Sequence, residues 1–312
     1  MKTELIIIIS ILSVILFVLL LSFILFMLVF YSRTRKPVAD DYYPLPNGKI
    51  YEPHYEQIQK WIKEFRNSEY KNVSITSHDG LTLRGRYYKF YDNKPIELML
   101  HGYRGDLEKD LSGGIERARR VGHNVLIVDQ RASGRSDGHI ISFGVIEHID
   151  CVGWVDYIIK EIDSEAKIIL SGVSMGAATV LMASGCELPE NVIGVLADCG
   201  YNSPDKIIKD VIRKLHLPAS IIYPFIALGA RLFGGFSLSK YSPMIAVQKT
   251  NLPIIFFHGD NDDFVPMQMS VDNFNKCKSE KKKLVITKGA GHGLCFIVDE
   301  QEYIDEVVKF FG

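Results

Sequence analysis

A serine lies between two glycines at the point where a short apolar run gives way to an alanine-rich stretch. The segment reads KIILSGVSMGAATVLMASG, with Gly172, Ser174 and Gly176 at alternate positions. This spacing predicts a sharp turn from a strand into a helix, which leaves the hydroxyl of Ser174 exposed as a nucleophile. The amide of Met175, at the start of the helix, is expected to point toward an oxyanion. Taken alone, the spacing is also compatible with a tight turn that has only a structural role.

A serine hydroxyl needs a general base and a third group that orients the base. When a serine occupies a turn of this kind, the acid and then the histidine follow it along the chain. His292, in GAGHGLC, is the one histidine after the apolar run that ends in FFHG. It directly follows another apolar run, at 282–288, so we expect its imidazole to reach Ser174. The alternative is a histidine that only caps or braces its loop.

Three aspartates could supply the acid. Asp260, Asp262 and Asp263 all lie in HGDNDDFVP, after the apolar run at 252–259. A buried carboxylate bonded to His292 would fix the tautomer of the imidazole and stabilise the imidazolium. The residue types alone do not choose among the three.

An oxyanion hole also needs a second amide donor, which normally comes from the loop after the third strand. Here that loop is HGYRGD, residues 101–106. Gly102 allows the backbone to approach a substrate, so the amide of Tyr103 is the expected donor. Each such donor lowers the barrier by roughly 3 kcal/mol. We expect His101 to brace this loop rather than to take part in the chemistry.

Elements that can position these groups alternate along the chain after a predicted β-hairpin that begins near residue 73. Apolar runs typical of strands occur at 96–101, 124–129, 167–172, 192–198, 252–259 and 282–288. Helical patterns occur at 107–121, 144–162, 175–186, 266–277 and 296–311. Continuously apolar strands that alternate with helices predict an α/β fold, in which a mostly parallel central sheet carries helices on both faces.

Residues 203–238 interrupt this alternation. They contain no strand pattern and are predicted to form two short helices broken at Pro218. An insertion at this place is a candidate lid over an active site. Its apolar side chains favour an acyl group or another apolar group as substrate, or they only pack the lid onto the domain. These residues are Ile207, Ile208, Ile212, Leu215, Ile221, Ile222, Phe225, Ile226 and Leu232.

The first 31 residues differ from the rest of the chain. The run Leu5–Tyr31 contains no charged residue, and about 20 apolar residues suffice to cross a bilayer core. It is longer than the apolar core of a cleaved signal peptide and lacks a small-residue cleavage site. We therefore expect a transmembrane anchor at 1–31, a juxtamembrane linker and amphipathic helix at 32–72, and a catalytic domain at 73–312. The amphipathic helix, near 52–67, either packs on that domain or lies on the membrane through Trp61.

The membrane orientation follows from basic residues near the ends of the apolar run. Arg33, Arg35 and Lys36 flank its C-terminal end, whereas only Lys2 and the terminal amine flank the other. This bias predicts a single-pass protein whose catalytic domain is cytoplasmic. An odd number of cysteines, five, also fits a reducing compartment. The opposite orientation remains the alternative, because short N-terminal tails often stay inside.

The composition excludes several classes of function. The chain of 312 residues has 36 Lys and Arg against 37 Asp and Glu, without the basic excess that a nucleic-acid partner requires. Its nine histidines form no HExxH motif, and its cysteines form no CxxC motif. We therefore expect no metal, no cofactor and no nucleic-acid partner.

Taken together, the motifs resemble those of the α/β-hydrolase superfamily, in the group that includes bacterial serine hydrolases, serine aminopeptidase-like proteins and monoacylglycerol-lipase-like proteins. The matching segments are SHDGLTLRGRYY, LHGYRGD, VDQRASGRSDG, GVSMGAA, YSPMIAVQKTNLPIIFFHGDNDDFVP and GAGHG. The resemblance implies that the acid is Asp262, the third residue after the glycine of HG. In DQRASGRSDG, Ala132 and Ser133 depart from the Asp-x-Arg-Gly-x-Gly pattern of relatives. The anchor followed by this domain also resembles small membrane-tethered hydrolases.

The sequence therefore predicts a membrane-anchored serine hydrolase that cleaves an ester, thioester or amide through an acyl-enzyme on Ser174. A carboxylesterase or lipase that acts on a small, lipid-like acyl substrate fits best. The first alternative is a peptidase, aminopeptidase-like, that uses the same triad. The second is a non-catalytic binding protein on the same fold, since a fold alone does not imply activity.

Overall fold

The computed structural model describes residues 2–33 and 43–312. Across these residues, eight strands form one sheet in the order β1-β2-β4-β3-β5-β6-β7-β8. The strands are β1 (Lys71–Thr76), β2 (Thr82–Tyr88), β3 (Ile96–Leu100), β4 (Asn124–Asp129), β5 (Ile168–Val173), β6 (Val192–Asp198), β7 (Ile254–Gly259) and β8 (Lys282–Thr287). β1 and β2 form an antiparallel hairpin, and β2 pairs antiparallel with β4. All other neighbours pair in parallel, so the predicted α/β fold with a mostly parallel sheet is confirmed.

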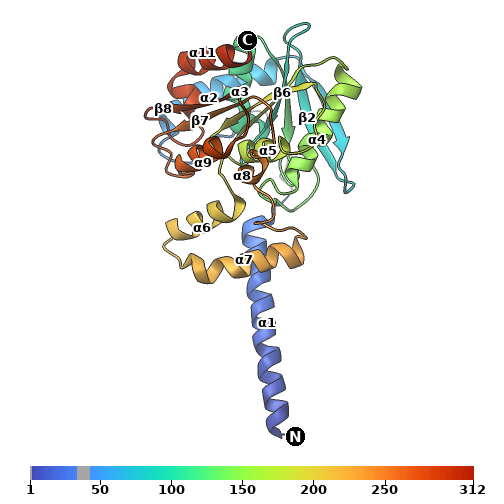
Figure 1. Ribbon diagram of the computed structural model, residues 1–312, viewed down its shortest axis with the longest axis vertical. Helices are drawn as coiled ribbons and strands as arrows, with labels where there is room; N and C mark the ends of the chain where they lie inside the picture. Colours follow the sequence, from blue (N-terminus) through green and yellow to red (C-terminus); the bar gives the residue numbers. More distant parts are fainter. Residues whose placement is uncertain (1, 34–42) are drawn as a thin grey trace.

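Helices cover both faces of the sheet (Figure 1). One face carries α2 (Tyr55–Asn67), α3 (Leu107–Arg120), α10 (Cys295–Val298) and α11 (Glu300–Phe311). The other face carries α4 (Glu147–Tyr157), α5 (Met175–Ala183) and α9 (Gln268–Lys276). A short α8 (Pro243–Ala246), a 3₁₀ turn η1 (Glu52–His54) and a π-helical turn η2 (Ile158–Ile162) complete this part of the chain. Strands β3 to β7 are buried along nearly their whole length, as expected where helices cover both faces.

The amphipathic helix α2 packs on the folded domain. The ring of Trp61 stacks on that of Phe296, with 5.6 Å between their centroids, and only 4% of Trp61 is exposed. Its neighbours Ile62 and Phe65 are buried as well. Of the two expectations for this helix, packing on the domain is therefore correct, and contact of Trp61 with a membrane is wrong.

Helix α1 (Lys2–Phe30) projects from the folded domain (Figure 1). Its length and composition allow it to cross a membrane or to act as a signal sequence. Most of its apolar side chains are exposed, and within the described part of α1 the buried residues are Ser22, Phe26 and Phe30. The C-terminal end is fixed to the domain, because the Phe30 carbonyl accepts a hydrogen bond from the Ile141 amide at 2.8 Å.

The predicted pair of helices in 203–238 is present as α6 (Pro204–Lys214) and α7 (Ala219–Phe233), which we call the cap. The cap lies between the folded domain and the free part of α1 (Figure 1). Helix α7 crosses α1 closely at Gly229, where a Cβ atom would lie 2.5 Å from the Ser22 carbonyl oxygen. Only glycine permits this approach. The rings of Phe23 and Phe233 also pack edge to face, 5.1 Å apart.

Candidate active site

Ser174 occupies the turn between β5 and α5, with φ 56° and ψ −117°. Residues other than glycine rarely adopt this backbone conformation. The turn can form because Gly172 and Gly176 allow the strand and the helix to pack closely. A Cβ atom on Gly172 would lie 2.4 Å from the backbone of Gly176. One on Gly176 would lie 2.0 Å from the Leu100 carbonyl oxygen. The backbone thus has the strained strand-to-helix geometry that the spacing predicts.

The structure brings the three predicted triad residues together. His292 Nε2 lies 2.9 Å from Ser174 Oγ, and His292 Nδ1 lies 2.7 Å from Asp262 Oδ2. Neither of the other two candidate acids is hydrogen-bonded to His292 among the described residues. Asp260 Oδ1 accepts a hydrogen bond from the Gly289 amide at 2.6 Å, and the backbone carbonyl of Asp263 contacts Lys214 Nζ.

Asp262 is held in its ionised form by its surroundings. Burial alone would raise its pKa, but hydrogen bonds with His258 and His292 hold the pKa well below its ordinary value. The amides of Phe264 and Val265 also donate to Asp262 Oδ1, at 2.9 and 2.8 Å. A carboxylate in this state can stabilise the imidazolium that forms when His292 takes a proton.

His258 was not predicted as part of this site. Its Nε2 lies 3.2 Å from Asp262 Oδ2, and the side chain is fully buried. Its Nδ1 lies 2.7 Å from Ser270 Oγ on α9. The one signal in the sequence is a histidine inside the apolar run that forms β7, because a buried imidazole requires polar partners.

The predicted oxyanion loop lies against the nucleophile. A Cβ atom on Gly102 would lie 3.5 Å from the Cβ atom of Ser174. The amides of Tyr103 and Met175 donate to no acceptor among the described residues, so both can receive a developing oxyanion. Asp110 Oδ2 accepts from the Gly102 amide at 3.0 Å and holds the loop from one side.

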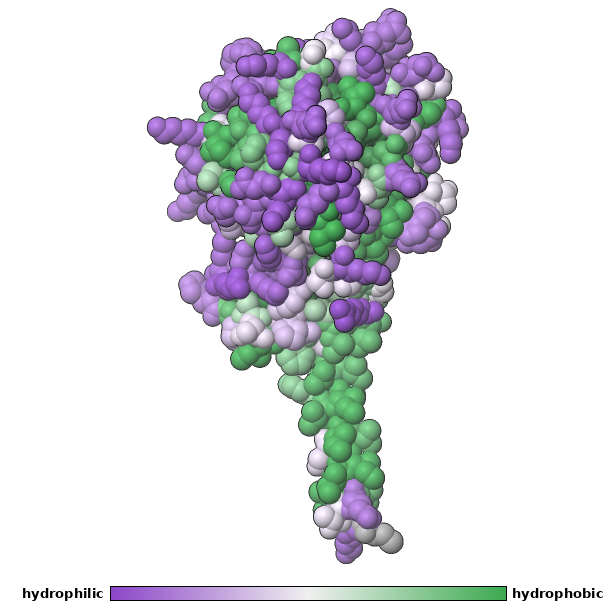
Figure 2. All heavy atoms as spheres, in the orientation of Figure 1, coloured by the Kyte–Doolittle hydropathy of each residue, from purple (hydrophilic) through white to green (hydrophobic). Residues whose placement is uncertain are grey.

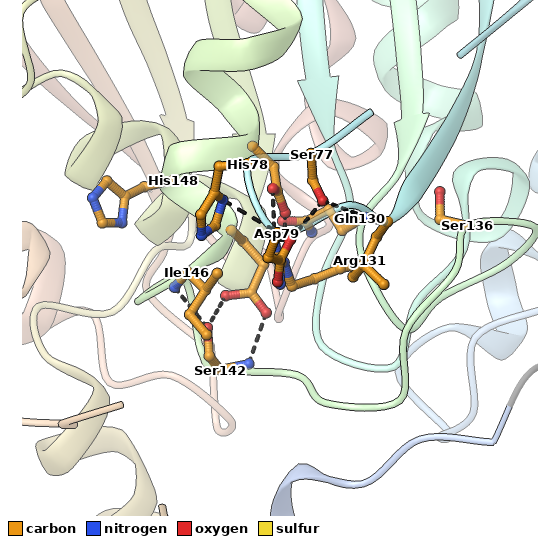
Figure 3. A network of polar contacts seen from close by, with 12 residues as sticks. Ser77, His78, Asp79, Gln130, Arg131, Ser136, Ser142, Ile146 and His148 are labelled. Atoms are coloured by element: carbon orange, nitrogen blue, oxygen red, sulfur yellow. Dashed lines mark hydrogen bonds and ion pairs between the residues drawn. The ribbon is translucent and has the colours of Figure 1, made fainter. Parts of the chain in front are cut away.

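His101 holds the same loop in place through hydrogen bonds with Gln130. Its Nε2 accepts a hydrogen bond from the Gln130 amide at 3.1 Å, and Gln130 Nε2 donates to the His101 carbonyl at 2.6 Å. Next to Gln130, the guanidinium of Arg131 pairs with Asp150 at 2.6 Å. It also pairs with Asp79 at 2.9 Å (Figure 3). These ion pairs connect the loop after β4 to the β1–β2 turn and to α4. They thereby hold Gln130 in position for its hydrogen bonds with His101.

A pocket of about 350 Å³ opens beside Ser174 and His292. Its apolar wall includes Ile58 and Trp61 of α2, together with Met99 and Phe296. No residue of 203–238 lines it, so of the two roles expected for the apolar cap residues, this pocket favours packing onto the domain. Four of those residues, Ile207, Ile208, Ile212 and Ile226, are instead buried where the cap packs on the domain.

The same pocket also contains polar groups. Asp198, at the end of β6, accepts a hydrogen bond from the Tyr303 hydroxyl at 3.0 Å through Oδ2, whereas Oδ1 has no partner among the described residues. Burial raises the pKa of Asp198. Nearby, Arg117 and Glu97 form a buried ion pair at 2.6 Å, so their charges offset each other.

One group of potential metal ligands at this site includes two residues of the triad. In the described residues, Cys199, Asp262 and His292 place one donor atom each within 4.8 Å of one another. Two of the three already bond to each other, and burial raises the pKa of the Cys199 thiol well above its ordinary value. A thiolate, the form that binds metals, is therefore disfavoured.

A nucleophile turn after β5, an acid after β7 and a histidine after β8, on a mostly parallel sheet, define an α/β-hydrolase arrangement. A family model for the α/β hydrolase fold matches residues 98–241. The matched region and the strand topology show the α/β-hydrolase fold that the motifs predicted.

The chain is similar to proteins from several organisms. Protein YqkD of Bacillus subtilis (strain 168) is 25% identical over 250 residues, which are 80% of this chain and 81% of that protein. Protein bem46 of Schizosaccharomyces pombe is 26% identical over 226 residues, which are 71% of this chain and 70% of that protein. Among solved structures, the esterase Pf2001 of Pyrococcus furiosus has a TM-score of 0.65 at 20% identity, over 90% of this chain and 99% of that chain. At this identity the structural likeness concerns the fold.

Proposed function

We propose that this protein is a serine hydrolase that cleaves an ester, thioester or amide of an acyl substrate, with carboxylesterase- or lipase-like activity above all. The observation that carries the proposal is the continuous chain of hydrogen bonds from Ser174 Oγ through His292 to Asp262. Every position of the triad is filled, which counts against a non-catalytic binding protein. The name of the esterase Pf2001, which shares the fold, is consistent with ester cleavage.

The proposed reaction has two halves. In the first, His292 Nε2 takes the proton of Ser174 Oγ while the oxygen attacks the substrate carbonyl. The amides of Tyr103 and Met175 stabilise the oxyanion, and the protonated His292 then gives its proton to the leaving alcohol, thiol or amine. In the second, His292 activates a water molecule that releases the acid from Ser174. Asp262 keeps the imidazole oriented throughout.

A fluorophosphonate probe tests the nucleophile. We expect a single label at Ser174, and Ser174→Ala should abolish it. His292→Ala should reduce labelling by about 10³-fold or more, because the serine loses its base. Ser184→Ala, at the other end of α5, is the matched control and should label like the wild type. Efficient labelling of Ser174→Ala would contradict the proposal.

A peptidase that uses the same triad is the second candidate. The observation in its favour is Asp198, whose free Oδ1 in the pocket could bind the amino group of a substrate. Amino-acid p-nitroanilides and p-nitrophenyl esters should be compared directly. If the anilides react better, and Asp198→Asn removes this preference, the peptidase is supported over the esterase.

We further propose that α1 anchors the protein in a membrane and that the hydrolase domain faces the cytoplasm. Arg33 lies at the domain side of α1, while Arg35 and Lys36, on which the orientation also depends, lie outside the described residues. All five cysteines are free thiols, which supports a reducing compartment. Alkaline phosphatase and green fluorescent protein, each fused after Gly312, test the orientation. High phosphatase activity with dark fluorescent protein would place the domain outside.

A further inference from the structure

The last turn of α1 is built into the hydrolase domain, so the two have a fixed relative orientation. The Ile141 amide donates to the Phe30 carbonyl, and the Ser32 amide donates to the His139 carbonyl, both at 2.8 Å. The ring of Phe30 is fully buried and packs edge to face against Phe236, 5.2 Å away. A flexible linker would allow the domain to rotate relative to α1. These contacts prevent such rotation.

This orientation sets the height of the cap relative to a bilayer. Hydrocarbon about 30 Å thick is crossed by about 20 helical residues that rise 1.5 Å each. Counted from Leu5, the first apolar residue after Glu4, such a span ends near Ile24. Helix α7 crosses α1 at this level, with Gly229 against Ser22 and Phe233 against Phe23.

The free side of the cap at this level is apolar. Ile221 and Leu232 are separated by eleven residues, which places them on one side of α7, and Leu217 lies just before the start of the helix. The opposite side carries Ile226 and Ala230, which are buried. The exposed set, which we call the cap face, consists of Leu215, Leu217, Ile221, Leu232 and Phe233, between 41% and 64% exposed.

The cap face continues the apolar surface of α1. Figure 2 shows hydrophobic residues along the edge of the cap that adjoins α1, and hydrophilic residues over most of the domain beyond it. An apolar surface of this extent is rarely left in water. Its neighbour along the molecule is the helix that we place in lipid, so lipid is the environment that suits both.

We propose that the cap face lies in the headgroup–acyl boundary of the bilayer, so that α7 is an interfacial helix parallel to the membrane plane. Apolar faces of such helices enter this boundary by about 5–10 Å. The protein then contacts the membrane through two elements, one that crosses it and one that lies on it. This inference rests on the proposed anchoring role of α1.

Tryptophan quenching by brominated lipid tests the cap face. The wild type has two tryptophans, Trp61 and Trp154, both buried in the hydrolase domain, so its signal can be subtracted. Ile221→Trp and Leu232→Trp should be prepared in the full chain, reconstituted in phosphatidylcholine vesicles with or without bromine near the acyl carbonyl. We expect each added fluorescence to fall by about half, given the depth of an interfacial helix. Both positions are exposed, so the substitutions leave the core intact.

Two further variants separate the possible failures. Val308→Trp, on the exposed side of α11 far from α1, should not be quenched. Leu16→Trp, in the middle of α1, should be quenched by bromine placed deeper in the acyl chain.

Quenching at Leu16→Trp without quenching at Ile221→Trp and Leu232→Trp would overturn the cap-face proposal and leave the anchor in place. No quenching at Leu16→Trp would instead contradict the anchor. Shielding of the cap tryptophans from acrylamide without bromine quenching would mean that protein, such as a second copy, covers the face.

Discussion

The hydroxyl of Tyr103 donates a hydrogen bond to the backbone carbonyl of Val29, 2.6 Å away. The contact joins the oxyanion loop to the last turn of α1, across 74 positions of sequence. Arg104 reinforces it, because its Nη2 donates to the Leu28 carbonyl at 2.8 Å. The amide that we assign to the oxyanion hole therefore belongs to a residue whose side chain is held by the N-terminal helix.

Removal of this hydroxyl should lower turnover without a change in substrate binding. Tyr103→Phe keeps the amide donor but loosens the loop that aims it. We expect kcat on p-nitrophenyl acetate to fall about tenfold, less than the 10²–10³-fold that follows complete loss of a donor, with KM nearly unchanged. Tyr241→Phe, which loses a similar hydrogen bond to the Met182 carbonyl at 2.9 Å, is the control and should retain its kcat. Equal kcat values for the two variants would contradict a positioning role for Tyr103.

The acid of the triad can be tested among the three neighbouring aspartates. Asp262→Asn should lower kcat by about 10⁴-fold, because an amide at this place favours the wrong tautomer of His292. Asp263→Asn should remain within a few-fold of the wild type, since its side chain is not bonded to the triad. Asp260→Asn should lose only the Gly289 contact. Ester hydrolysis by the three purified variants measures this, and similar rates for all three would reject Asp262 as the acid.

Helix α2, rather than the cap, should set the preference for acyl chain length. Ile58 lines the pocket and is nearly buried, so Ile58→Trp fills space that a long acyl group would occupy. We expect kcat/KM for p-nitrophenyl octanoate to fall by about 10–100-fold relative to acetate, since a mismatch of this size costs about 1–3 kcal/mol. Ile221→Trp, on the cap face, is the matched control. A shift of its chain-length profile would mean that the cap takes part in acyl binding.

The buried ion pair predicts a specific dependence of stability on pH. Burial alone would raise the pKa of Glu97, but Arg117 and His123 lower it to about 2. Because the folded pKa lies below the ordinary value of 4.5, the pair stabilises the fold above that pH, and this stabilisation is lost as pH falls toward 2. Glu97→Gln leaves a buried guanidinium unpaired and should lower the free energy of unfolding at pH 7 by about 3–5 kcal/mol.

Urea unfolding of the detergent-solubilised protein at pH 7, 5, 4 and 3 measures this difference. The gap between wild type and Glu97→Gln should narrow as the pH decreases. Glu116→Gln removes a pair with the exposed Arg119 and should cost less than about 1 kcal/mol at any of these values. A gap that stays constant with pH would show that folding does not change the pKa of Glu97, and would contradict its stabilisation by Arg117.

Local patterns predicted most of the sheet because each strand carries its own signal. The runs that form β3 to β8 are continuously apolar, and their observed ends differ from the predicted ones by two residues or fewer. The predicted helix at 144–162 begins only at Glu147 and changes to a π-helical turn at Ile158. Its first residues form a loop instead, in which Gly144 has φ 81°, outside the helical region.

Sequence could also nominate Ser174 and His292, because their glycine-rich turns follow strands that end at the same edge of the sheet. It could not anticipate the contacts that the N-terminal 51 residues make with the site. The Val29 carbonyl is a backbone group, so the type of residue at this position does not indicate its hydrogen bond with Tyr103. The hydroxyl of Tyr51 donates to the His292 carbonyl at 2.9 Å. Nothing in the sequence around Tyr51 distinguishes it from a tyrosine in a linker. The role of the apolar cap residues stayed open between two alternatives for a similar reason, since apolar side chains do not reveal whether they face a ligand, a helix or the solvent.

The conformation of Ser174 has a thermodynamic consequence for the whole molecule. A non-glycine residue held at φ 56° and ψ −117° opposes folding by about 1–3 kcal/mol, and the rest of the sheet must overcome this. Glycine adopts positive φ with little penalty, so a Ser174→Gly chain should be inactive and yet melt at a higher temperature than the wild type. The residue that we assign to the chemistry is thus a weak point of the fold, and selection for thermal stability alone would remove it.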